Sequence, residues 1–378
     1  MSLGKQYDFN IYSIWLISIA LLLVTPLYYS MGYVLIFDSL LVVALCLLLR
    51  KVKLNSSECI IFGLMLVFYL IYVVNMVASN AMLNVKNSLV MFCTIIASYL
   101  LSKYEPTYRD YRLFDVLCFL IQLYVIFYSL YYAKTGIFPF DWNYVDFSMF
   151  AIFAFTLGMK RGYCCTSAIL AIIASAVLPA RTWFLFLALF ILFYFLKGFV
   201  AQVLQCKLFG KTILIILYLF IAITLLAYFW VDVLSQYFAV IEGHGAAFDQ
   251  ANMERFTTMK MANEIMIKEN FFFKGLDMIS LYEPYLDKYD ILMPNVGPHN
   301  SFHGILLYYS ICFGGIYLLV LSRIVDHVTC KEMIPYIYPY LICCCILHDN
   351  LTGFRFFLFA IVLLVPFKGK TGRRIVWR

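Results

Sequence analysis

Long hydrophobic runs follow one another along most of the chain, and short polar segments separate them. A helix that crosses the hydrocarbon core of a bilayer needs about 20 largely apolar residues. When the hydrophobic runs are compared with this length, the pattern predicts an all-α polytopic membrane protein with roughly twelve transmembrane helices. The predicted spans are Ile11 to Tyr29, Tyr33 to Leu49, Cys59 to Ala78, Ser88 to Leu101, Leu113 to Tyr132, Asp146 to Gly158, Tyr163 to Val177, Thr182 to Leu196, Thr212 to Trp230, Asn300 to Leu321, Ile334 to Leu347 and Leu351 to Pro366.

One long stretch between the hydrophobic runs is polar, and it divides the chain into three parts. We expect residues 1–230 to form an amino-terminal transmembrane bundle and residues 231–298 to form a loop outside the membrane. Residues 299–378 then supply further transmembrane helices and a tail, within a single integral membrane domain.

Within this loop, helical spacing of apolar residues predicts an amphipathic helix from Met253 to Glu269, preceded by capping residues between Asp249 and Asn252. We expect the segment from Asn270 to Gly275 to end this helix, with Gly275 as the stop. Two interpretations are open for the helix: a lid packed on the bundle, or a lipid-binding helix at the membrane surface. The apolar residues at helical spacing are Met259, Ala262, Ile265 and Met266.

The charges indicate an orientation. The net charge is +7 and only 13% of residues are charged. Most basic residues form short clusters in alternate connecting segments, which is the distribution of the positive-inside rule. It places both termini in the cytoplasm and the long loop on the outer side, and it leaves no reason to expect a nucleic-acid partner. Nearly all of the twelve cysteines lie in apolar runs, which favours buried thiols over disulfides or metal ligands.

A few ionisable residues stand where the membrane meets the outer side. Arg181 begins an apolar span, and a guanidinium at a span end must reach water or an anion. Arg255 lies at the start of the amphipathic helix. His299 precedes a span, and His303 follows one helical turn later, a spacing that can bind a metal. Because no carboxylate stands at the spacing of a zinc helix, we do not expect a metal.

The order of these residues along the chain and the short motifs around them resemble the O-antigen polymerase and O-antigen ligase superfamily of bacterial inner-membrane proteins. The resemblance depends on short motifs and covers mainly Pro179 to Gly315. Phe271 departs from the family pattern, which commonly has proline there, and Leu276-Asp277 replaces an expected second glycine. The motifs are Ala180-Arg181-Thr182, Glu254-Arg255-Phe256, Phe273-Lys274-Gly275, His299-Asn300-Ser301-Phe302 and Gly314-Gly315.

The resemblance implies a metal-independent glycosyltransferase without a cofactor, whose donor is an undecaprenyl-pyrophosphate-linked oligosaccharide and whose long loop is periplasmic. Arg181, Arg255 and Asn300 are then expected to hold the pyrophosphate, because arginine pairs bidentately with phosphate oxygens. His299 is expected to take the proton of the attacking sugar hydroxyl. The secondary candidates are His303, His348 and Arg355.

Three functions fit this interpretation. A polymerase would extend the lipid-linked repeat chain, with a chain-length regulator protein as a possible partner. A ligase would transfer the finished polysaccharide to lipid A core. A flippase for the same lipid-linked glycan is the alternative from another class, but the sequence shows neither clear repeated halves nor paired broken spans.

Overall fold

The computed structural model describes residues 52–80, 82–103, 108–137, 144–178, 180–205, 221–222, 224–226, 228–229, 246–275, 285, 288, 300–328 and 331–348. The predicted spans at 11–29, 33–49 and 351–366, and most of the span at 212–230, lie outside the described residues. So do His299 and Arg355. Of Arg255 the structure describes only the backbone, as part of a helix.

The described residues form helices and no strand, as a helical membrane protein requires. Among the described residues, four stretches are long and apolar enough to cross a membrane: Ser56–Ala78, Asp115–Thr135, Arg181–Val203 and Ile311–Val328. The count of about twelve spans stays a prediction. The helices are α3 (Ser56–Ala78), α4 (Met82–Lys103), α5 (Tyr108–Thr135), α6 (Tyr144–Arg161), α7 (Cys164–Val177), α8 (Arg181–Gln205), α11 (Ala246–Lys268), α13 (Ser301–Tyr309), α14 (Ile311–Val328), the 3₁₀-helix η5 (Lys331–Met333), α15 (Ile334–Tyr340) and the π-helix η6 (Leu341–Ile346).

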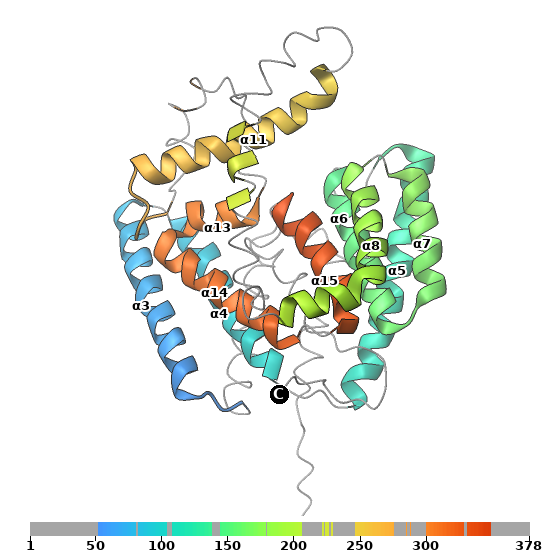
Figure 1. Cartoon of the computed structure of the whole chain (residues 1–378), viewed down its shortest axis with the longest axis horizontal. Coiled ribbons are helices and arrows are strands. Elements are labelled where there is room, and N and C mark those ends of the chain that lie inside the picture. Colours follow the sequence, from blue (N-terminus) through green and yellow to red (C-terminus); the bar gives the residue numbers. More distant parts are fainter. Residues whose placement is uncertain are drawn as a thin grey trace, which may run out of the picture.

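The bundle has two packed groups of helices. Helices α3, α4, α13 and α14 lie together on one side, and α5 to α8 lie on the other, with α15 packed against α8 and α6 (Figure 1). Much apolar surface remains uncovered: only 11% of the apolar window of α8 is buried, and Phe195 on this helix is 78% exposed. A surface of this kind is stable when lipid covers it, which supports a membrane location.

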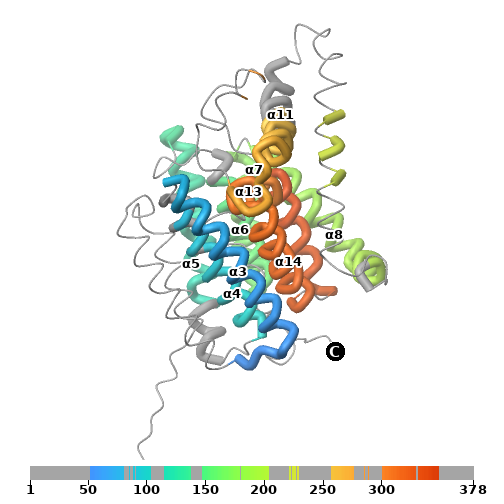
Figure 2. The backbone as a smooth tube through the Cα atoms, turned by 90° about the vertical axis from the view of Figure 1, so that its left-hand side faces the viewer, coloured from blue at the N-terminus to red at the C-terminus, as the bar shows by residue number. Residues whose placement is uncertain are grey.

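Helix α11 crosses one end of the bundle, directly above α13 (Figures 1 and 2). The predicted helix is therefore confirmed, but its expected start is wrong, because Asp249 to Asn252 lie inside it. It ends at Lys268, where Asn270 takes a left-handed conformation (φ 50°) and Phe271 N donates to Met266 O over 3.3 Å, so Gly275 is not the stop.

The lower face of α11 is buried against the bundle, as the lid interpretation predicts. Its apolar residues pack on the α13 side chain of Leu307. On its outer surface, Glu264 pairs with Lys268 and with Lys288, and the hydrogen bond that Lys268 donates to Glu264 raises the pKa of Lys268. The buried residues of this contact are Met261, Ala262, Ile265, Met266, Phe271, Tyr285 and Leu307.

The predicted span Asn300 to Leu321 is wrong, because the structure divides it at Ser310 into α13 and α14. Ser310 has φ 71°, which ends α13. The first N–H groups of α14 then need acceptors, and the segment after α11 provides them: Ile311 N donates to Phe271 O over 2.9 Å and Cys312 N to Phe272 O over 3.1 Å. Tertiary contacts therefore set this break together with Ser310, whose Oγ accepts from Phe313 N over 3.3 Å.

The basic pair Lys160-Arg161 belongs to one of the basic connecting segments of the charge pattern, and the structure buries it. Both side chains are buried at the end of α6 that lies away from α11, and Arg161 Nε donates to Asp115 Oδ1 over 2.6 Å. A buried guanidinium needs such a partner, because desolvation without one is costly. The pair therefore fastens α6 to α5 as well as contributing to the charge pattern.

Candidate functional site

The beginnings of α8 and α13 meet the end of η6 at one place in the bundle. Thr182 Oγ1 lies 2.8 Å from Nε2 of His348, and Ser301 Oγ donates to the carbonyl oxygen of His348 over 3.1 Å. Asn300 Nδ2 donates to Ile346 O over 2.9 Å. These buried contacts join three segments that lie far apart in the sequence, and we call this group of residues the His348 junction.

Asn300 sets the start of α13. Its backbone is extended (φ −145°, ψ 121°), and its Oδ1 accepts hydrogen bonds from Phe302 N at 2.9 Å and His303 N at 3.2 Å. This is the usual N-cap arrangement, in which a side-chain oxygen satisfies backbone donors of the first turn. Because the side chain is completely buried and its oxygen and amide are both occupied, it is a structural cap. Its expected contact with pyrophosphate stays a prediction.

The third segment reaches the junction through an irregular helix. Pro339 lies inside α15 and has no N–H to donate, and the chain continues as the π-helix Leu341–Ile346. Leu347 N donates to Ile342 O over 3.1 Å, a π-type bond that closes the segment just before His348. Such π-helical turns occur frequently at functional sites.

Arg181 stands beside the junction, because it directly precedes Thr182. Ala180 and Thr182 on either side are buried, whereas Arg181 itself is exposed at the first residue of a candidate span. The amino termini of α8 and α13 both carry the positive end of a helix dipole. A fixed guanidinium and two such helix ends near one place favour a negatively charged ligand.

The structure places the predicted site residues differently. Arg181, Asn300 and His348 come together at the junction, and His299 is joined to it through its peptide bond to Asn300. Arg255 lies in α11, which packs on α13.

His303 differs from these residues, since it is completely buried and its Nε2 lies 3.4 Å from Thr224 Oγ1. Its place is inside the bundle rather than on an open surface. Thr182 and Ser301 were predicted only as parts of motifs, and no spacing in the sequence indicates that both contact His348.

Replacing Asn300 with alanine is expected to destabilise the protein by about 1–3 kcal/mol, because α13 loses its cap and the buried carbonyl of Ile346 loses its donor. Asn300→Ser keeps a capping oxygen, so we expect a smaller loss. Thermal unfolding of the purified variants in detergent measures both. Equal stability of wild type and Asn300→Ala would contradict the assigned role of this side chain.

The resemblance described above depends on short motifs and on the placement of their residues. Comparison of the chain with protein-family models, with curated proteins and with solved structures finds no match. The functional argument therefore depends on the residues of the His348 junction and their chemistry.

Proposed function

We propose that the chain is a glycosyltransferase of the O-antigen polymerase type. It joins repeat units of a surface polysaccharide that are carried on a polyprenyl pyrophosphate, at the periplasmic face of a bacterial inner membrane. One observation carries the proposal: the His348 junction holds the start of α8, with Arg181, against the start of α13, which follows His299. Two sequence motifs separated by more than one hundred residues thereby supply one site.

The proposed reaction needs a cation for the leaving group and a base for the nucleophile. The acceptor hydroxyl oxygen attacks the anomeric carbon of the donor sugar, and the bond from that carbon to the pyrophosphate oxygen breaks. Arg181 and Arg255 stabilise the negative charge that grows on the diphosphate, an effect that is strong where water is scarce. His299 takes the hydroxyl proton, which commonly contributes a factor of about 10²–10⁴ in rate.

The surroundings of Arg181 suit a lipid-linked donor. The residue begins a candidate span, and exposed apolar side chains such as Phe184 and Leu185 follow it on α8. A pyrophosphate on a polyprenyl chain lies at the same boundary between hydrocarbon and water, so the donor reaches the site from the bilayer. The lid α11, with Arg255 nine residues after its first residue Ala246, approaches from the aqueous side.

The direct test reconstitutes the purified protein in liposomes with lipid-linked repeat units and without added metal. A polymerase yields a ladder of longer lipid-linked chains on a gel. Only single repeat units after long incubation would overturn the proposal.

A deletion strain separates the polymerase from the ligase. Loss of a polymerase leaves single repeat units on the cell surface glycan, whereas loss of a ligase leaves long chains that are not delivered to lipid A core. The second pattern, together with a failed ladder reaction, would reassign the chain as a ligase.

A further inference from the structure

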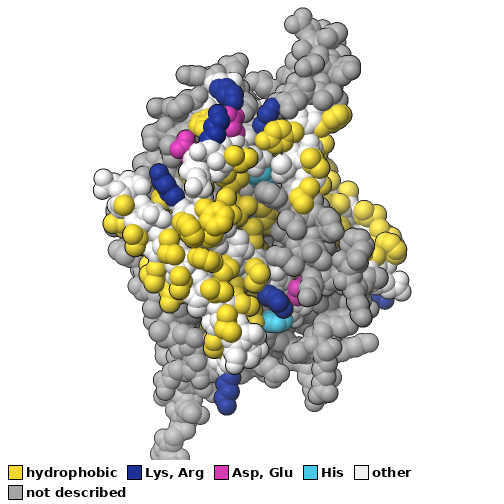
Figure 3. Space-filling view, turned by 60° about the vertical axis from the view of Figure 1, so that its left-hand side comes forward, with side chains coloured by type: hydrophobic (Ala, Val, Ile, Leu, Met, Phe, Trp, Pro, Cys, Tyr) yellow, Lys and Arg dark blue, Asp and Glu magenta, His cyan; other side chains and the backbone are white. Residues whose placement is uncertain are grey.

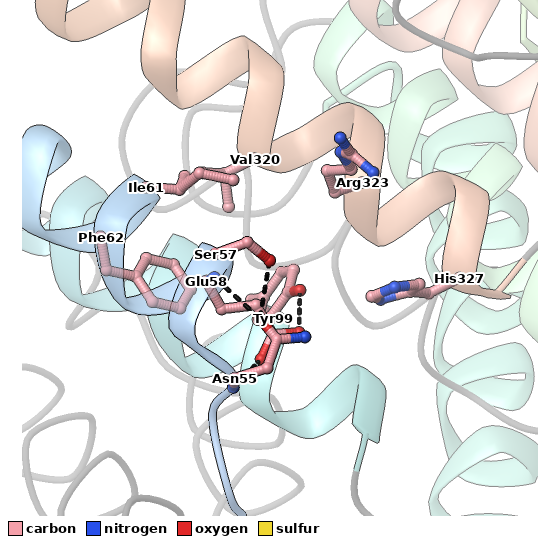
Figure 4. A pocket seen from close by; sticks show the side chains of 9 residues that line it. All are labelled: Asn55, Ser57, Glu58, Ile61, Phe62, Tyr99, Val320, Arg323 and His327. Atoms are coloured by element: carbon pink, nitrogen blue, oxygen red, sulfur yellow. Dashed lines mark hydrogen bonds between the residues drawn. The ribbon is translucent and has the colours of Figure 1, made fainter.

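A cavity of ≈ 180 Å³ lies at the end of the bundle opposite to α11, where α3 begins and where α4 and α14 end (Figure 4). On this face of the molecule, basic, acidic and histidine side chains gather below an otherwise hydrophobic surface (Figure 3). The cavity is lined by Asn55, Ser57, Glu58, Ile61, Phe62, Tyr99, Val320, Arg323 and His327.

The carboxylate in this cavity is already satisfied by the protein. Glu58 Oε1 accepts a hydrogen bond of 2.7 Å from the Tyr99 hydroxyl and forms an ion pair with Lys103, and Oε2 accepts a hydrogen bond of 2.8 Å from Asn55 N. Glu58 is only 7% exposed. A carboxylate engaged on both oxygens and neutralised by a lysine is a poor ligand for a cation, so the cavity is not suited to a metal ion or an amine.

The remaining fixed charge of the lining is the guanidinium of Arg323. Arg323 and His327 stand one helical turn apart on α14, and both are exposed. Nδ1 of His327 lies 3.5 Å from Ser102 Oγ, and its ring faces Tyr99 with the centroids 5.4 Å apart. Among the described residues, no ion pair engages Arg323, and Asp326 beside it is not part of the lining. The planar fork of a guanidinium matches a phosphate group in both geometry and charge.

The position of the cavity relative to the membrane indicates which molecule carries the phosphate group. The candidate span Ser56–Ala78 begins here and the candidate span Ile311–Val328 ends here, so the cavity lies at a boundary between hydrocarbon and water. The side chains of Ile60 and Leu64 next to it on α3 are 63% and 46% exposed. Phospholipid phosphates lie at this depth, with their acyl chains extending along apolar helix surfaces.

We propose that this cavity binds a phosphate ester, with Arg323 as its bidentate partner, and that in the membrane the ester belongs to an anionic phospholipid. His327 and Glu58, which is neutralised by Lys103, line the cavity beside Arg323. The site lies away from the His348 junction, and its existence does not depend on the proposed reaction.

Native mass spectrometry of the purified protein, titrated with phosphatidylglycerol in detergent, tests the proposal. We expect Arg323→Gln to weaken retention of the lipid roughly tenfold or more, because a charge-assisted pair of hydrogen bonds is lost. Arg323→Lys keeps the charge but not the fork, so its effect should be smaller. The matched control is Lys331→Gln, an exposed cation at the same end that does not line the cavity.

Two further arms identify the recognised group. Diacylglycerol with the same acyl chains has no phosphate and should be retained much less than phosphatidylglycerol. Inorganic phosphate should displace the lipid if the cavity also accepts a free anion, and should fail to displace it if the acyl chains are required. In both cases, weaker retention of phosphatidylglycerol by Arg323→Gln supports the site.

Equal retention of phosphatidylglycerol by wild type and Arg323→Gln, or equal retention of diacylglycerol and phosphatidylglycerol by the wild type, would overturn the proposal. The thermal unfolding of each variant in detergent shows that the comparison is made on folded protein. Because Arg323 is exposed, we expect these substitutions to leave the fold intact.

Discussion

Arg181→Ala is expected to abolish glycan extension while the amount of protein in the membrane stays unchanged. A fixed cation at the leaving diphosphate is worth about 10²–10³ in rate, by analogy with single donors that stabilise transition-state charge. The side chain is exposed at the start of α8, so its removal leaves the packing of Thr182 and His348 in place. The measurement is the ladder of lipid-linked products in liposomes, read beside an immunoblot of the membrane fraction.

The chain offers a matched control on the same helix. Lys197 also lies on α8, away from the His348 junction, and its ammonium group stands 4.4 Å from the ring centroid of Tyr194. Lys197→Ala removes one positive charge and should leave the ladder unchanged. We expect His299→Ala and Arg255→Ala to lose the ladder as Arg181→Ala does. Full activity in all three variants would refute the assigned site.

Gly275→Ala is expected to destabilise the contact between the α11 segment and the bundle by about 1–3 kcal/mol, the usual cost of overpacking. A Cβ at this position would collide with the backbone carbonyl group of Tyr308 and would also crowd the ring of Tyr72. Backbone atoms cannot turn aside as a flexible side chain can. The strain falls on the segment whose Phe271 and Phe272 carbonyls accept from the first turn of α14.

Thermal unfolding in detergent, combined with limited proteolysis of α11, measures this effect. Gly315→Ala is the matched control, because a Cβ there meets nothing within 4 Å and the residue lies inside α14. We expect that variant to be neutral, or stabilised by up to about 1 kcal/mol. If Gly275→Ala unfolds and is cleaved as the wild type is, the close approach to Tyr308 does not limit this position.

Hydrophobic patterning predicts where the helices lie better than where they end. The run from Cys59 to Ala78 predicts α3, and the structure adds a first turn through a capping box: Glu58 N donates to Asn55 Oδ1 over 2.9 Å and Asn55 N to Glu58 Oε2 over 2.8 Å. Helix α8 runs past its predicted end at Leu196, because Lys197 is a good helix former and packs on Tyr194.

The break at Ser310 and the His348 junction could not be predicted in the same way. Ser310 carries no local signal for a left-handed residue. Its Oγ accepts from Phe313 N over 3.3 Å, but the acceptors for Ile311 N and Cys312 N belong to Phe271 and Phe272, far away in the sequence. Likewise, Thr182 and His348 are 166 residues apart, and only the packed bundle brings them together. Sequence reasoning identified residues of suitable chemistry, and the fold shows which of them lie together.

The central claim is that the start of α8 and the residue before α13 belong to one site. A photoreactive amino acid placed at His299 in the membrane-embedded protein tests it directly, with the crosslinked peptides identified by mass spectrometry. Because Asn300 contacts Ile346 and Ser301 contacts His348, we expect crosslinks to residues 180–182 and 346–348. Crosslinks that avoid both segments would show that Arg181 and His299 lie apart, and would contradict the account.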